Sequence, residues 1–292
     1  MTFRPRRSVL YMPGSNARAI EKARTLPVDG VIIDLEDAVA PAAKEAARNQ
    51  VAETVRLGGF GRREVFIRVN GIDTPWHADD MTAAAQCAPD AILVPKIGTV
   101  DQLELVGQRL LDMKVNLKTR VWAMIETPQA IFNINALAAE AHDSETRLAG
   151  FVLGTNDLAR ETRARIVPGR APMLSWLARC ILAAHAHRID ILDGVYNDIG
   201  NAAGFAAECA QARDFGFDGK TLIHPSQIEP CNAAFSPTPE EVAEARKIIA
   251  AFDLPENQTK GVVQIDGRMV ERMHADIAHR TVAIADAVAQ QK

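Results

Sequence analysis

Short apolar runs alternate with amphipathic stretches along most of the chain. Eight runs are hydrophobic throughout rather than at every second position, a pattern typical of strands covered on both faces of a parallel sheet. These runs are Ser8–Met12, Gly30–Asp34, Glu64–Val69, Ala91–Pro95, Val121–Ile125, Gly150–Gly154, Ile189–Val195 and Lys220–Ile223. They follow one another at intervals of about 30 residues, the length of one βα unit. We therefore predict an α/β fold, a (β/α)₈ TIM barrel over residues 1–254.

The stretches between these runs carry signals for the start of helices. Thr99 is followed three residues later by Gln102, which is the pattern of a capping box. Thr127 precedes Pro128, and proline is favoured at the first position of a helix because its missing N–H needs no partner there. These signals support helices after the fourth and fifth runs, as the barrel requires.

The end of the chain departs from the repeat. A polar stretch at residues 256–260 is followed by a short apolar run, Gly261–Ile265, and by a helical pattern over Met269–Gln291. The eight βα units require none of these elements. We therefore predict that residues 255–292 form an appended C-terminal helical segment, which serves as a lid or as a contact between subunits.

The composition excludes several classes of protein. The 292 residues include 33 Lys and Arg against 37 Asp and Glu, so the net charge of −4 gives no general attraction to nucleic acid or anionic lipid. No apolar stretch has the h-region of a signal peptide or the roughly 18 residues of a membrane helix. The four cysteines lie too far apart for a zinc motif or a compact disulfide framework. We expect a cytoplasmic protein with reduced thiols that binds neither nucleic acid nor membrane.

Polar or turn-forming residues follow every predicted strand, at the rim where TIM barrels carry their active sites. Glu126 and Asp157 follow neighbouring strands, and two carboxylates completed by water and substrate suit Mg²⁺. Either carboxylate could instead cap a helix or pair with a cation. Arg68 ends an apolar strand, where a guanidinium is costly unless it meets an anion. That anion could be a substrate carboxylate or an enolate oxygen, or else Glu36 or Asp37 of the neighbouring strand.

Three further rim positions have two interpretations each. Lys96 could form a Schiff base or a salt bridge with the acidic rim. His224 could donate a hydrogen bond to a ligand or cap a helix. The turn at Pro13 and Gly14 precedes a helix, so its amides could bind a phosphate or could simply form a turn.

Six short motifs occur in a characteristic order. They are Arg7-Ser-Val-Leu-Tyr-Met-Pro-Gly14, Asp34-Leu-Glu-Asp-Ala-Val39, Ile67-Arg-Val-Asn70, Ile125-Glu-Thr127, Gly154-Thr-Asn-Asp-Leu158 and Ile223-His-Pro225. With these motifs the chain resembles, over roughly residues 4–290, the citrate lyase β-subunit-like family of the HpcH/HpaI aldolase superfamily. Stand-alone members of that family include malyl-CoA and citramalyl-CoA lyases.

The resemblance implies roles for particular residues. It implies that Glu126 and Asp157 hold Mg²⁺, and that Arg68 binds the oxo-acid part of the substrate and helps to stabilise an enolate. The residues implied to bind substrate are Arg68, Glu126, Arg7, Pro13, Gly14 and His224.

The chain departs from the family pattern at two positions. Asn156 stands where family members commonly have glutamate, which changes the charge beside the metal. The family's C-terminal motif usually ends in an aspartate that reaches a neighbouring subunit's site as an acid or base, whereas the stretch Gly267–Glu271 ends in glutamate. We expect Glu271 to take that catalytic role, or else the substrate differs from the family's.

The resemblance therefore implies a Mg²⁺-dependent oxo-acid lyase. Such an enzyme reversibly cleaves a 3-hydroxyacyl-CoA thioester, such as malyl-CoA or citramalyl-CoA, into an acyl-CoA and a 2-oxo acid, glyoxylate or pyruvate. The alternatives are a citrate lyase β subunit that acts on a carrier-protein thioester, a CoA-independent Mg²⁺ aldolase, and a thioester-binding barrel without catalysis. By the same resemblance we expect a homotrimer or homohexamer.

Overall fold

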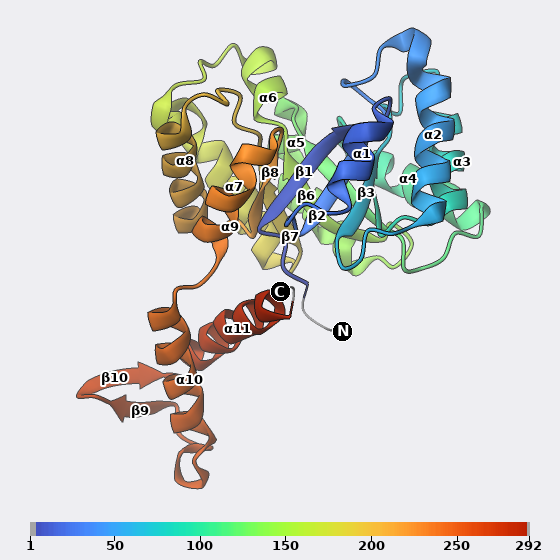
Figure 1. Cartoon of the computed structure of the whole chain (residues 1–292). Coiled ribbons are helices and arrows are strands. Elements are labelled where there is room, and N and C mark those ends of the chain that lie inside the picture. The colour runs from blue at the N-terminus through green and yellow to red at the C-terminus, as the bar shows by residue number, and fades with distance from the viewer. Residues whose placement is uncertain (1–3, 291–292) are drawn as a thin grey trace. The chain divides into compact units, whose positions relative to one another are not determined.

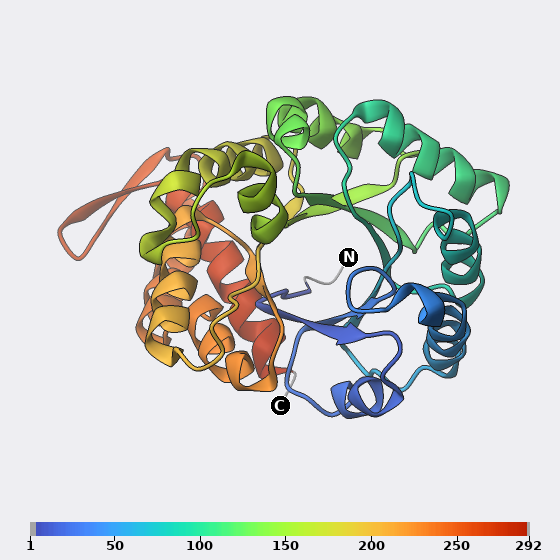
Figure 2. The same cartoon turned by 90° about the horizontal axis from the view of Figure 1, so that it is seen from above.

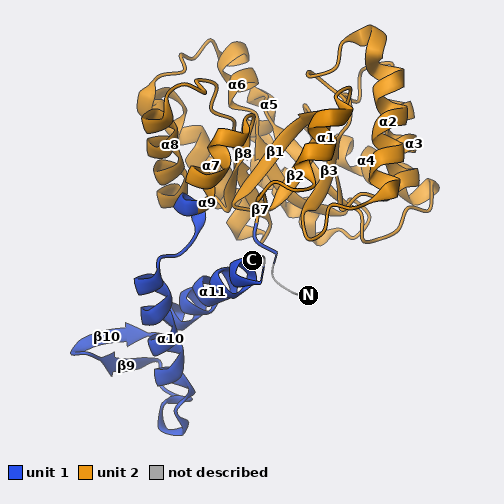
Figure 3. Ribbon diagram, in the orientation of Figure 1, with its two compact units in different colours: residues 1–5, 233–292 blue, residues 6–232 orange. Residues whose placement is uncertain are grey.

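The structure is a computed structural model that describes residues 4–290, and these form two compact units (Figure 3). Residues 6–232 make up the barrel unit, and residues 233–290, with residues 4 and 5, make up the C-terminal unit. Helix α10 (Pro239–Asp253), which we expected within the barrel range, belongs to the C-terminal unit. The ends of the two predicted ranges, residues 1–3 and 291–292, lie outside the described residues.

Eight parallel strands close into a barrel (Figures 1 and 2). Each strand pairs with the next one along the chain, and the first pairs with the eighth to close the ring. They are β1 (Ser8–Pro13), β2 (Gly30–Asp34), β3 (Glu64–Arg68), β4 (Ala91–Val94), β5 (Arg120–Ile125), β6 (Leu148–Leu153), β7 (Asp190–Asp193) and β8 (Gly219–Leu222). All eight lie within or close to the predicted runs, and the TIM barrel is confirmed.

Helices connect the strands and surround the ring, as Figure 2 shows. They are α1 (Ala17–Ala23), α2 (Lys44–Leu57), α3 (His77–Cys87), α4 (Val100–Asp112), α5 (Pro128–Ala139), α6 (Thr155–Thr162), α7 (Leu174–Ala186), α8 (Ala202–Phe215) and α9 (Ile228–Phe235). The predicted start signals are confirmed. Thr99 and Gln102 form the capping box of α4, and the Thr127 hydroxyl accepts a hydrogen bond from the backbone of α5.

A layer of apolar side chains fills the interior of the barrel. It consists of Val9, Ile32, Phe66, Ala91, Leu93, Trp122, Met124, Val152 and Leu192. The rings of Phe66 and Trp122 meet edge to face with centroids 5.3 Å apart. Because side chains alternate between the two faces of a strand, residues two positions beyond this layer also face the barrel axis.

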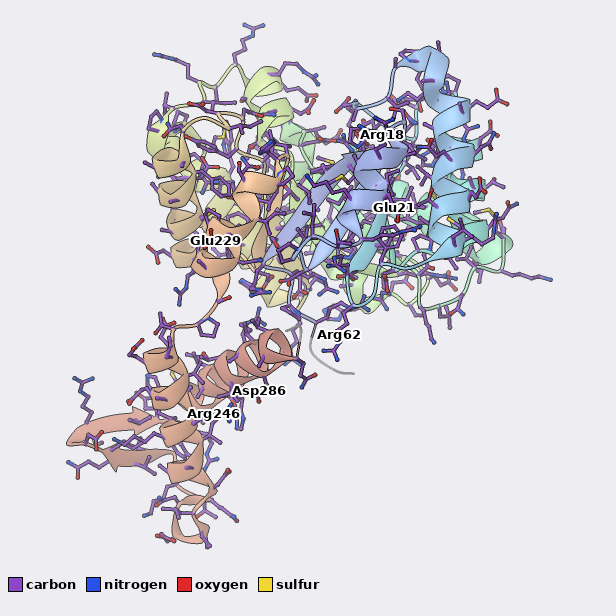
Figure 4. The ribbon with its side chains drawn as sticks, in the orientation of Figure 1. Arg18, Glu21, Arg62, Glu229, Arg246 and Asp286 are labelled. Atoms are coloured by element: carbon purple, nitrogen blue, oxygen red, sulfur yellow. The ribbon has the colours of Figure 1, made fainter. Side chains whose placement is uncertain are left out.

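The C-terminal unit has its own small core. Strands β9 (Val262–Ile265) and β10 (Arg268–Glu271) form an antiparallel hairpin beside α10 and α11 (Arg272–Ala289). An ion pair of 2.5 Å between Arg246 and Asp286 joins the two helices (Figure 4). The core cluster consists of Phe252, Val263, Ile265, Val270 and Ala275.

The helix predicted over Met269–Gln291 begins three residues later, at Arg272. Asp266 and Gly267 both have positive φ, at 49° and 79°, and connect β9 to β10 as a two-residue turn. An Asp-Gly pair favours this kind of hairpin, so the chain pairs as a strand before the helix starts. Gln291 lies outside the described residues.

All four cysteines are buried as free thiols, as predicted. Among residues 4–290, no helix has both the length and the apolar character needed to cross a bilayer.

Candidate functional site

A cavity of about 310 Å³ opens at the carboxyl ends of the barrel strands. Its lining combines charged and apolar side chains. The lining residues are Tyr11, Asp34, Asp37, Ala38, Arg68, Met124, Leu153, Gly154, Thr155, Asn156, Asp157, Val195, Thr221 and Ile223. The cavity lies at the end of the barrel where TIM-barrel enzymes bind their substrates.

Strand periodicity places the charged groups at this end. Asp34 and Arg68 each follow a residue of the apolar layer by two positions, on β2 and β3. Glu126 follows Met124 by two positions, directly after β5. All three therefore face the barrel axis near the carboxyl ends of the strands, although they are far apart in sequence.

Arg68 is held by carboxylates on several sides. Its Nε and Nη2 atoms each donate to one oxygen of Asp34 at 2.7 Å, and its Nη1 lies 2.9 Å from Glu36 and 3.5 Å from Asp37. Burial disfavours charge on Asp34, but the Arg68 guanidinium outweighs that effect and holds the pKa of Asp34 below its usual value. The predicted partners Glu36 and Asp37 are thus confirmed, and the closest partner, Asp34, is an addition.

Glu126 is a buried carboxylate without a cationic partner. It is 1% exposed, and its Oε1 accepts a hydrogen bond of 2.8 Å from the backbone N–H of Lys96. Among the residues that the structure describes, no lysine, arginine or histidine forms an ion pair with it. Burial, then the negative charges of Glu36 and Asp157, raises the pKa of Glu126 to about 8 despite Arg68. The site therefore carries more negative charge than its cations balance.

Gly154 fixes the space around Glu126. A Cβ atom at this position would lie 2.4 Å from the Glu126 Cβ and 2.6 Å from its Oε2, so a side chain would displace the carboxylate. Helix α6 starts with the next residue and carries Asp157 in its first turn, where Asp157 lines the cavity and pairs with Arg160 at 2.6 Å. The pairing with a rim cation, one of the alternatives for Asp157, is therefore present.

The donor set suits a hard divalent cation. Glu126 and Asp157 offer carboxylate oxygens, and residues 4–290 contain no group of three or more histidine, cysteine, aspartate or glutamate residues that could enclose a metal. Mg²⁺ uses one or two carboxylates and keeps water or substrate oxygens in its other positions. The residues present therefore fit Mg²⁺ better than a metal that needs a complete protein cage.

Other predicted site residues have partners away from the cavity lining. Arg7 precedes β1, at the opposite end of the barrel, and its guanidinium donates twice to Asp29 at 2.8 Å. The N–H of Gly14 donates to the carbonyl of Asp34 at 2.8 Å, which joins the turn after Pro13 to β2. The structure brings none of these three predicted residues, Arg7, Pro13 or Gly14, to the lining.

Three further residues singled out from the sequence, His224, Lys96 and Glu271, also lie outside the cavity lining. The side chain of His224 accepts a hydrogen bond from the backbone of Ser226, which is the helix-capping interpretation. The Lys96 ammonium lies 3.4 Å from the Glu36 carboxylate, so the salt bridge, one of its two alternatives, is present. Glu271 belongs to the C-terminal unit, where it caps α11.

The sequence reasoning assigned no role in the site to Tyr11 or Asp34, although Asp34 ends a predicted strand at the rim. Tyr11 and Asp34 each lie two positions after a barrel-layer residue, Val9 or Ile32. Both belong to the motifs shared with the family, Arg7–Gly14 and Asp34–Val39. Counting in steps of two from the apolar positions would have found them.

Comparisons of the sequence and of the structure with known proteins agree with one another. The sequence profile of the HpcH/HpaI aldolase/citrate lyase family matches residues 7–225. A (3S)-malyl-CoA thioesterase of Cereibacter sphaeroides is 47% identical over 285 residues, or 98% of this chain and 96% of that protein. The citrate lyase subunit beta of Escherichia coli is 33% identical over 290 residues, or 97% and 94%.

A solved structure extends the likeness to three dimensions. Mycobacterium tuberculosis CitE in complex with magnesium, acetoacetate and coenzyme A is 28% identical and superposes with a TM-score of 0.74, covering 95% of this chain and 97% of that one. The family profile spans most of the barrel unit, and the relatives align over nearly their whole length. The chain belongs to the HpcH/HpaI aldolase/citrate lyase family.

Proposed function

We propose that this protein is a Mg²⁺-dependent oxo-acid lyase that cleaves a 3-hydroxyacyl-CoA thioester such as malyl-CoA or citramalyl-CoA. The observation that carries the proposal is the buried Glu126 carboxylate, which lacks an ion-pair partner among the described residues while Asp157 and Glu36 add negative charge. A divalent cation held by Glu126 and Asp157 would balance that charge. The complex of a relative with magnesium and coenzyme A supports the assignment.

The chain's own residues prepare the site for this reaction. Magnesium, when bound, supplies a Lewis acid that polarises substrate oxygens. The Lys96 N–H holds the Glu126 carboxylate through a hydrogen bond, and Gly154, which has no side chain, leaves room for that carboxylate. Asp34 fixes the plane of the Arg68 guanidinium, which lines the cavity and offers a positive charge to the carboxylate of the bound acid.

Cleavage breaks the bond between carbons 2 and 3 of the acyl chain. The hydroxyl on carbon 3 gives up its proton to solvent and becomes the carbonyl of the 2-oxo acid. The electron pair of the broken bond moves onto the thioester carbonyl oxygen, and the resulting enolate takes a proton at carbon 2 to give the acyl-CoA. Arg68 stabilises the negative charge that develops, and we assign the proton transfer at carbon 2 to Glu271.

We further propose that Glu271 acts within a homotrimer or homohexamer, in the site of another copy. Apolar side chains of the C-terminal unit support a contact between copies. Met269, Met273 and Ile277 are 73%, 57% and 59% exposed, and the last two lie four residues apart on one face of α11.

Hydrolysis is the second candidate, because relatives at 45–47% identity are (3S)-malyl-CoA thioesterases. In that reaction water attacks the thioester carbonyl carbon, the C–S bond breaks, and the sulfur leaves with a proton as the thiol of CoA. The acyl chain stays intact as the free hydroxy acid.

The products separate these candidates. The purified full chain is incubated with malyl-CoA and with citramalyl-CoA, once with Mg²⁺ and once with EDTA. Formation of a 2-oxo acid and an acyl-CoA identifies the lyase, whereas free CoA thiol with malate or citramalate identifies the thioesterase. Turnover of a carrier-protein thioester alone would identify a citrate lyase subunit, and turnover of the free hydroxy acid would identify a CoA-independent aldolase.

A matched pair of variants tests the metal site. Glu126→Gln keeps the size of the side chain and removes its charge, so Mg²⁺-dependent turnover should fall by at least about 100-fold. Glu229→Gln makes the same change at an exposed position on α9 (Figure 4) and should retain activity. A Glu126→Gln variant with wild-type Mg²⁺ dependence would exclude Glu126 from the metal site.

A further inference from the structure

Tyr11 places a phenol at the wall of the cavity, beside the group that binds anions. It follows Val9 by two positions on β1, so its ring faces the barrel interior and packs against the apolar layer. The Arg68 guanidinium lies 5.1 Å from the centre of that ring. The electron-rich face of the ring thereby supports the cation that we assign to substrate binding.

The hydroxyl of Tyr11 has a weak partner only. Its contact is the sulfur of Met124 at 3.9 Å, and a thioether is a poor acceptor. In the part of the chain that the structure describes, no oxygen or nitrogen atom accepts a hydrogen bond from this hydroxyl. Tyr11 is partly buried and lines the cavity, so this donor is available to a group that enters the cavity.

The surroundings keep this hydroxyl protonated. Burial raises the pKa of Tyr11 well above its usual value, and the negative charges of Asp34, Glu126 and Glu36 act in the same direction against Arg68. The group is therefore a hydrogen-bond donor at neutral pH. It cannot serve as a base.

We propose that the Tyr11 hydroxyl donates a hydrogen bond to the substrate oxygen that gains negative charge during the reaction, and is thus a catalytic residue beside Arg68. The inference rests on the proposed function, since it needs a substrate with such an oxygen. It applies to both candidate reactions, because the enolate of cleavage and the tetrahedral species of hydrolysis each develop charge on an oxygen.

A purely structural role predicts a different outcome for one substitution. Tyr11→Phe removes the hydroxyl and keeps the ring against Arg68 and the apolar layer. If Tyr11 only supports Arg68, this variant keeps wild-type kinetics. If the hydroxyl donates to the transition state, kcat falls by about 10- to 100-fold while KM changes little, because the bond strengthens as the charge develops.

The chain offers a matched control, since it contains two tyrosines. Tyr196→Phe removes the other tyrosine hydroxyl. Tyr196 is not among the residues that line the cavity, and its ring packs edge to face on Phe205. We expect Tyr196→Phe to keep wild-type kcat, and both variants to keep the wild-type melting temperature. A Tyr11→Phe variant as active as the wild type overturns the inference alone, whereas a wild type that turns over no substrate overturns the proposed function as well.

A spectroscopic measurement tests the contact without turnover. The Tyr196→Phe protein, produced with 3-fluorotyrosine, carries fluorine at Tyr11 only. With Mg²⁺ present, acetyl-CoA and pyruvate are added separately, and the ¹⁹F resonance is followed. A shift with either probe supports the hydrogen bond and shows which half of the substrate makes it. An unchanged resonance when both probes are saturating overturns the inference.

Discussion

Glu126 is an acid that resists ionisation when no cation is bound. Burial, followed by the negative charge of its neighbours, raises its pKa to about 8 from a reference value of 4.5. Between these pH values the folded chain keeps a proton that the unfolded chain releases. The folded state therefore binds more protons, and its stability falls as the pH rises through this range.

A pH series on Glu126→Gln should reveal this effect. With EDTA present, the free energy of unfolding of the wild type should fall relative to that of the variant between about pH 4.5 and 8. Above pH 8 the difference should be constant, at an order of a few kcal/mol. Urea unfolding at several pH values measures it, with Glu229→Gln as the control that keeps the wild-type profile. A difference that does not change with pH would contradict the raised pKa.

Asp34 and Asp37 both pair with Arg68, but at very different depths. Asp34 is buried, whereas the Asp37 side chain is 66% exposed and lies 3.5 Å away. Asp34→Asn weakens a buried, two-point ion pair, and we expect a loss of about 3–5 kcal/mol in unfolding free energy. Asp37→Asn should cost less than about 1 kcal/mol, since exposed ion pairs contribute little. Thermal and urea unfolding measure the stability of both variants. Equal losses of unfolding free energy would show that burial of the carboxylate does not set its contribution to stability.

At the scale of elements, the barrel strands were the most predictable part of the molecule. Each is apolar along its whole length because helices cover one face and the barrel interior the other. The strand ends place Arg68 and Asp157 in the cavity lining, and Glu126 lies just behind the lining residue Gly154. The protonation of Glu126 could not be predicted, because it depends on Glu36 and Asp157 from other strand ends.

The hairpin of the C-terminal unit, unlike the barrel strands, differs from the element that the sequence pattern predicts. The pattern over Met269–Gln291 predicts a helix throughout, although Asp266-Gly267 is itself a turn signal. Local turn preference and strand pairing together outweighed the helical periodicity of Met269 and Val270.

Gly267 should be the sensitive position of this turn. Its φ of 79° suits glycine, and Gly267→Val would place a β-branched residue in the left-handed region at about 1–2 kcal/mol. Gly261→Val is the matched control, since that residue has no positive φ and an added Cβ meets nothing within 4 Å at either site. Hydrogen exchange of residues 262–271 should accelerate in the first variant and not in the second. Equal protection in both would show that the turn tolerates a side chain.

At the scale of the whole molecule, sequence motifs identified the family but not the place of every motif residue. Arg7 and Arg68 both lie in shared motifs, yet Arg7 precedes its strand and Arg68 ends one. The first therefore lies at the amino end of the barrel, paired with Asp29, and the second in the cavity. Nor did the βα period show that α10 belongs to the C-terminal unit.

Assembly is a testable property at this scale. If copies of the chain associate through the C-terminal unit, the double substitution Met273→Lys and Ile277→Lys should lower the mass measured by light scattering and reduce turnover. Leu57→Lys, at a residue 74% exposed on α2, is the control for added surface charge. A wild-type protein that is monomeric and fully active would contradict the shared site.

The close approach of Gly154 to Glu126 also limits how this site can diversify. Positions such as Val195 and Ile223 contribute to the cavity wall through their side chains, so natural drift or laboratory selection can reshape the space for the acyl group there. At position 154 even a methyl group would meet the carboxylate. A mutant library for altered substrate range should therefore leave codon 154 untouched and vary codons such as 195 and 223.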